Sequence, residues 1–87
     1  MQIQQDNPER LKKLLDEAAG VTRAAFAERV ALLAGVTVVP ECITQWTARR
    51  RRPREHVREA IDQAARELLG RRLPPSGWPR IAYGTRS

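Results

Sequence analysis

The sequence predicts an all-α fold, a small four-helix domain followed by an irregular or short-strand C-terminal tail. Apolar residues recur at helical spacing in four separate segments. Residues that cap or end helices (Asn, Thr, Gly and Pro) stand between these segments. The chain of 87 residues is long enough for one modest core, and it is too short for an enzyme with a deep cleft plus a second module.

The first two helices are expected at residues 8–19 and from Thr22 to Gly35. Asn7 precedes Pro8, a pair that suits a helix start, and the leucines that follow recur every three or four residues. Thr22 is the predicted N-cap of the second helix, whose apolar face includes Phe26 and Ala27. Gly35 is expected to end it in the left-handed conformation.

The third helix is expected at about residues 40–48, and the fourth begins at Pro53 and ends at Gly70. The β-branched residues 36–39 predict an extended connection before the third helix. Four helices with short connections define a domain over residues 1–72.

Residues 73–87 contain too many prolines and glycines for a continuous helix. Trp78, Ile81 and Tyr83 are nevertheless apolar, so we expect them to be covered. The prediction is a dimerisation arm built on these three residues, and the alternative is that Trp78 folds back onto its own domain.

The positive charge lies in the second half of the chain. Residues 1–48 carry five basic and six acidic residues, whereas residues 49–87 carry eleven arginines and four acidic residues, within a net charge of +6. Such a field favours a polyanionic partner. No apolar run reaches the roughly 18 residues that span a bilayer, so we expect no membrane partner and a cytoplasmic location.

Residues 43–53 combine a helix with an arginine run. At 100° per residue, Ile43 and Trp46 share one face, which we expect to be buried. The other face carries side chains that can hydrogen-bond base edges, so we predict base contacts from Glu41, Thr44, Gln45 and Arg49. The alternative interpretation is an ordinary solvated helix surface.

The arginines after this helix are the densest charge in the chain. We predict phosphate contacts from Arg23, Arg50, Arg51, Arg52 and Arg54. The alternative is a solubilising loop.

Nothing in the sequence predicts an enzyme, a cofactor or a metal site. His56 has no nucleophile or carboxylate placed around it, and Cys42 has no second cysteine with which to bind zinc or form an internal disulfide. We expect His56 on the surface and Cys42 as a half-buried filler.

Four positions, Ala27, Gly35, Ile43 and Trp46, together resemble the helix-turn-helix of phage Cro and repressor proteins. In that family the small residue permits close helix crossing, the glycine makes the turn, and the apolar residues anchor the recognition helix. The resemblance spans residues 21–61, although the eight residues from Ala27 to Gly35 and from Gly35 to Ile43 exceed the family spacing. It implies a repressor-type regulator of phage or prophage origin that binds an operator in double-stranded DNA as a homodimer, at the nucleoid of a bacterial host.

Two other classes of function stay open. One is an antitoxin-like or adaptor module that grips a protein partner, and the other is a nonspecific nucleic-acid binder. A regulator discriminates its site from random duplex, a nonspecific binder does not, and an adaptor retains its activity in high salt.

Overall fold

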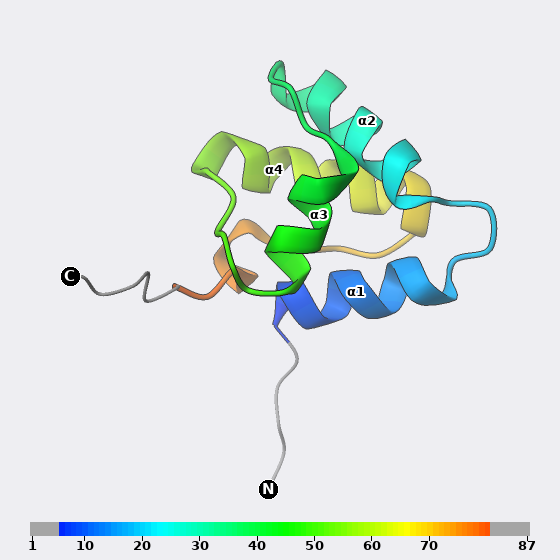
Figure 1. Cartoon of the computed structure of the whole chain (residues 1–87), viewed down its shortest axis with the longest axis horizontal. Coiled ribbons are helices and arrows are strands. Elements are labelled where there is room, and N and C mark those ends of the chain that lie inside the picture. The colour runs from blue at the N-terminus through cyan, green and yellow to red at the C-terminus, as the bar shows by residue number, and fades with distance from the viewer. Residues whose placement is uncertain (1–5, 81–87) are drawn as a thin grey trace, which may run out of the picture.

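The computed structural model describes residues 6–80 and confirms the all-α prediction (Figure 1). Its helices are α1 (Asn7–Glu17), α2 (Arg23–Ala34), α3 (Pro40–Thr47) and α4 (Glu55–Ala64). A π-helical turn, η1 (Ala65–Leu69), continues α4, and a 3-10 turn, η2 (Pro75–Gly77), follows. No strand occurs in this part of the chain.

The helices surround a single core. α2 packs against α4, and α3 packs against both α1 and α2. In Figure 1 α3 lies between α1 and α2 on the face toward the viewer, so one of its sides is covered and the other is open. The largest buried apolar side chains come from all four helices and from the segment after them: Leu11, Leu15, Phe26, Val30, Ile43, Trp46, Val57, Ile61, Leu73 and Trp78.

The ends of α2 follow the sequence prediction, whereas the start of α1 does not. Thr22 Oγ1 accepts a hydrogen bond from the backbone N–H of Ala25 at 3.0 Å, and Gly35 closes the helix at φ 71°. The N-cap of α1 is Asp6, whose Oδ1 accepts from the Glu9 N–H at 3.3 Å. Asn7 is instead buried, and its Nδ2 donates to the Pro74 carbonyl at 2.7 Å.

The segment after Gly70 folds back onto the helices. Leu73 is fully buried, and its N–H donates to Oδ1 of Asp62 at 2.8 Å, while Arg72 Nη2 donates to Oδ2 of the same carboxylate at 3.1 Å. Burial raises the pKa of Asp62, but these two hydrogen bonds and the nearby positive charges lower it more, so the pKa lies below its usual value. Asp62 is thus a charged anchor for the C-terminal segment.

Trp78 belongs to the same core, which corrects its assignment to a dimer interface. It is 2 % exposed, and its ring meets Trp46 edge-on with centroids 6.5 Å apart. A side chain this deeply covered by its own domain has no surface left for a partner. The core therefore extends beyond residue 72, where the sequence prediction placed the domain end. Ile81 and Tyr83 lie outside the described residues, so their dimer role stays a prediction.

None of the helices among residues 6–80 combines the length and the apolar character needed to cross a bilayer.

Candidate nucleic-acid interface

α3 is anchored by one face and open on the other. Ile43 is fully buried and Trp46 is 6 % exposed, which confirms the predicted anchoring side. On the remaining surface Glu41 and Thr44 are exposed and Gln45 is half-buried. The helix is therefore held from behind, with polar side chains on its solvent side.

The arginine run begins inside the C-terminal cap of α3. Arg49 has φ 63°, in the left-handed region that usually requires glycine. Its N–H donates to the Trp46 carbonyl at 3.2 Å, and the N–H of Arg50 donates to the Gln45 carbonyl at 2.9 Å. This pair of bonds is a Schellman cap, and it fixes where the following arginines leave the helix.

Arg49 is already paired in this structure. Its Nη2 donates to Oδ1 of Asp6 at 2.8 Å, and its Nη1 donates to Oδ2 of the same carboxylate. Burial raises the pKa of Asp6, but the Arg49 hydrogen bond and the Glu9 N–H outweigh it and lower the pKa. The hydrogen bond to Asp6 likewise raises the pKa of Arg49. A base or phosphate contact by Arg49 requires exchange of this carboxylate for a nucleic-acid acceptor.

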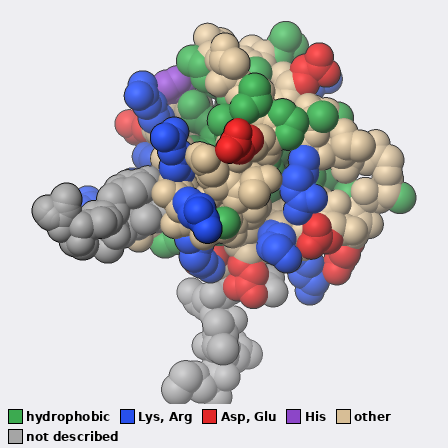
Figure 2. Space-filling model, in the orientation of Figure 1, with side chains coloured by type: hydrophobic (Ala, Val, Ile, Leu, Met, Phe, Trp, Pro, Cys, Tyr) green, Lys and Arg blue, Asp and Glu red, His purple; other side chains and the backbone are tan. Residues whose placement is uncertain are grey.

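A groove beside α3 brings several predicted residues together. It has a volume of about 260 Å³ and runs between α3 and the start of α4. Four of its lining residues, Gln45, Arg51, Arg52 and Arg54, were predicted to contact bases or phosphates. Figure 2 shows Lys and Arg side chains on both sides of the face that carries α3, with acidic side chains among them.

The other predicted contacts lie outside this groove. Glu41 and Thr44 are elsewhere on α3, where the Thr44 hydroxyl donates to the Pro40 carbonyl of its own helix at 3.5 Å. Arg50 is exposed in the loop. Arg23, the first residue of α2, pairs with Asp16 at 3.1 Å.

Within the groove, Arg52 differs from its neighbours. It is half-buried, and its Nε donates to the Trp78 carbonyl at 3.3 Å. Part of this side chain therefore holds the C-terminal segment, a structural role that the sequence did not predict.

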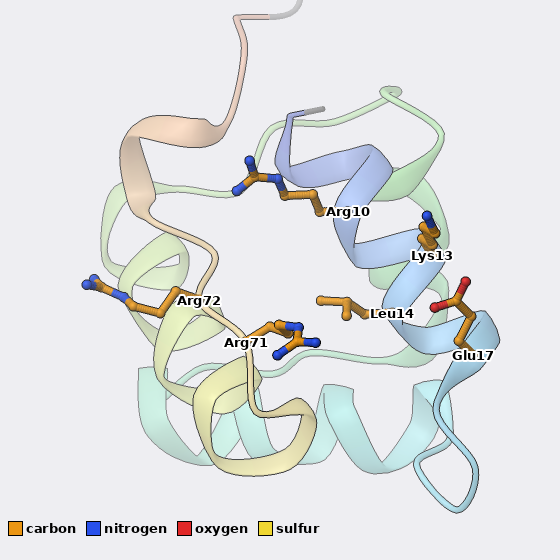
Figure 3. Close-up of a pocket in the computed structure, with 6 residues that line it drawn as sticks. All are labelled: Arg10, Lys13, Leu14, Glu17, Arg71 and Arg72. Carbon is orange, nitrogen blue, oxygen red and sulfur yellow. The ribbon is translucent and has the colours of Figure 1, made fainter. Parts of the chain in front are cut away.

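Two sets of residues were missed by the sequence reasoning. His56 lines the groove beside Arg54, and its position two residues after that arginine, at the start of a helix, was the available signal. A second basic cluster consists of Arg10, Lys13, Arg71 and Arg72, which line a cleft between α1 and the chain that follows η1 (Figure 3). The adjacent arginines 71 and 72 were visible in the sequence, but their partners on α1 become apparent only in the fold.

Residues 6–80 contain no group of three His, Cys, Asp or Glu side chains placed to hold a metal ion. Comparisons of the chain with protein-family models, with curated proteins and with solved structures give no match. The function is therefore inferred from the residues of the site itself.

Proposed function

We propose that this protein is a sequence-specific DNA-binding regulator of transcription, of the helix-turn-helix kind found in Cro and repressor proteins. The observation that carries the proposal is the groove beside α3. There Gln45, on a helix anchored by Ile43 and Trp46, lies next to Arg51 and Arg54. A hydrogen-bonding side chain on a rigid helix with guanidinium groups at its end suits a major groove flanked by phosphates.

The contacts divide into two kinds. Gln45 has the amide that pairs bidentately with adenine, and Glu41 and Thr44 extend the same polar surface toward the N-terminal end of α3. Arg50, Arg51 and Arg54 are exposed and supply phosphate contacts. Arg49 joins them after it releases Asp6, so its net contribution is smaller than that of an unpaired arginine.

The regulator acts in the cytoplasm. It binds DNA as a homodimer, because one short recognition helix meets only a few base pairs and two-fold symmetry doubles the contact. The described residues leave apolar surface at the C-terminal end of α2 and in the connection after it, where Leu32 is 73 % exposed. Leu33, Val36 and Val39 are also exposed there. A second copy packed on this surface would cover it.

Base recognition is tested by selecting bound duplexes from a random library and then measuring Gln45→Ala on the recovered site. We expect a loss of about 1–3 kcal/mol at that site and little change on random duplex. Gln63→Ala is the matched control, since Gln63 is exposed on α4 and bonds to Glu67. Equal losses on both duplexes would show that Gln45 is a general contact, and a library without a consensus would favour the nonspecific binder.

Phosphate contact is tested by the salt dependence of affinity. Arg51→Gln and Arg54→Gln should each reduce the slope of log affinity against log salt by about 0.9. Arg66→Gln, an exposed substitution on η1, should leave the slope unchanged. If the slope changes for neither groove variant, the arginine loop, residues 49–54, makes no phosphate contact.

The dimer is tested by mass in solution. Leu32→Gln should shift the mass toward a monomer if α2 forms the interface, whereas truncation after Arg80 should do so if Ile81 and Tyr83 form it. A full-length chain that is monomeric on its operator would contradict the homodimer. DNA binding that is absent while a protein complex persists in high salt would favour the adaptor function.

A further inference from the structure

A second basic site lies between α1 and the chain that follows η1. The cleft has a volume of about 350 Å³ and is lined by Arg10, Lys13, Leu14, Glu17, Arg71 and Arg72. The α1 residues recur every three or four positions and therefore share one face of the helix. Gly70, at φ 67°, ends the π-helical turn and directs the two arginines after it along the opposite wall.

Three of the four cations that line this cleft form no ion pair among the described residues. Arg72 pairs with Asp62 at 3.1 Å, but Arg10, Lys13 and Arg71 form no ion pair with any residue in the 6–80 range. Figure 3 shows Arg10 reaching over the gap from α1 and Arg71 extending toward Leu14 from the other wall, whereas Arg72 points away. Three like charges around one concavity repel one another, and a bound anion relieves that repulsion.

We propose that this cleft binds a small organic phosphate that carries two or more phosphate groups, such as a nucleoside diphosphate. Guanidinium groups on opposite walls suit the oxygens of a diphosphate, which they bind in bidentate pairs. Leu14 offers an apolar contact for the organic part of the ligand.

The size of the cleft favours a small ligand over a macromolecule. A volume near 350 Å³ lies in the range of small-molecule sites. A duplex is too wide to enter it and would touch only the rim. A ligand with a single carboxylate would balance only one of the three unpaired cations, so the cleft favours a multiply charged phosphate. This site is separate from the groove beside α3 and does not rest on the proposed DNA binding.

The test is calorimetric titration of the full chain with inorganic pyrophosphate and with adenosine diphosphate. We expect one saturable site, weakened at least about tenfold by Arg10→Gln and by Arg71→Gln, since each removes a charged hydrogen-bond donor. The matched control is the double variant Arg51→Gln, Arg54→Gln, which removes two arginines from the other basic surface. It should retain affinity, and a melting temperature recorded for every variant confirms that each is folded.

Four results would contradict the proposal. Binding that is lost in the control and kept in the cleft variants would place the anion in the arginine loop. Equal weakening in all variants would indicate a nonspecific charge effect, as would the absence of a saturable site. If adenosine diphosphate binds no more tightly than pyrophosphate, the cleft does not recognise the organic part of the ligand and the proposal of an organic phosphate is wrong. None of these results bears on whether α3 reads DNA, which the duplex selection decides separately.

Discussion

Gly77 is a position where one methyl group should disturb the fold. A Cβ added there would lie 2.5 Å from Oδ1 of Asn7, 2.8 Å from its Cγ and 2.9 Å from its Nδ2. Asn7 has no room to retreat, because it is 1 % exposed and its Nδ2 is held by the Pro74 carbonyl at 2.7 Å. Gly77 itself does not have positive φ, so alanine suits its backbone and the cost isolates the side-chain clash.

The expected cost of Gly77→Ala is about 2–4 kcal/mol. Overpacking contributes about 1–3 kcal/mol, and displacement of Asn7 from Pro74 loses a hydrogen bond of about 1 kcal/mol. Asn7→Ala alone should cost about 1–3 kcal/mol, because it leaves the Pro74 carbonyl without its donor. After that change the three clashing atoms are gone, so Gly77→Ala should then be neutral or slightly stabilising.

A double-mutant cycle measures this coupling. Urea unfolding followed by tryptophan fluorescence suits the purpose, since Trp46 and Trp78 are both buried and emit differently once exposed. The two substitutions should couple by about 2–4 kcal/mol, the whole cost of Gly77→Ala, because that cost disappears once the Asn7 side chain is truncated. Costs that simply add would refute the reasoning, because they would show that Asn7 and residue 77 do not share the space that the structure assigns to them.

Three further outcomes are expected. Arg49→Ala should be about 1 kcal/mol less stable than Arg49→Gly in urea unfolding, because both lose the Asp6 pair but only alanine is strained at positive φ; equal stabilities would contradict this. The pKa of Asp62 is lower in the folded protein than its usual value of 3.8, so the carboxylate stabilises the fold at pH values above 3.8. This stabilisation is lost as the pH falls through the lower pKa of the folded state. The wild-type melting temperature should therefore fall below about pH 4, and Asp62→Asn should be less stable at neutral pH with a shallower acid decline; parallel curves would contradict the anchor role. Trp46→Ala should cost about 3–5 kcal/mol by leaving a cavity beside Trp78, and normal melting would refute its core position.

The helical part of the fold was predictable because its signals are local. Thr22 and Gly35 mark the ends of α2 by backbone chemistry that depends on neighbours within one turn. Ile43 and Trp46 share a face through helical periodicity alone, and both are buried as expected. The same local rules predicted that Cys42 would be half-buried and that His56 would be exposed.

The contacts made by the chain ends were not predictable in this way. The hydrogen bond from Asn7 to Pro74 joins residues 67 positions apart, and the pair between Asp6 and Arg49 joins residues 43 apart. Composition showed that residues 73–87 were irregular, but irregular backbone can dock as firmly as a helix when its polar groups find partners. Asp62 provides such partners for Leu73 and Arg72, and no local pattern indicates that a carboxylate on α4 has this role.

These distant contacts also affect how the α3 surface can act. Both ends of the described chain bind the arginine loop that follows α3. Arg49 donates a hydrogen bond to the Asp6 carboxylate near the N-terminal end, and Arg52 donates one to the Trp78 carbonyl near the C-terminal end. A phosphate that takes either arginine breaks a bond that stabilises the free protein, so the affinity of the interface is a difference between two sets of contacts. Arg51 and Arg54 carry no such bond, and they should dominate the phosphate contribution even though the sequence gives all the loop arginines the same charge.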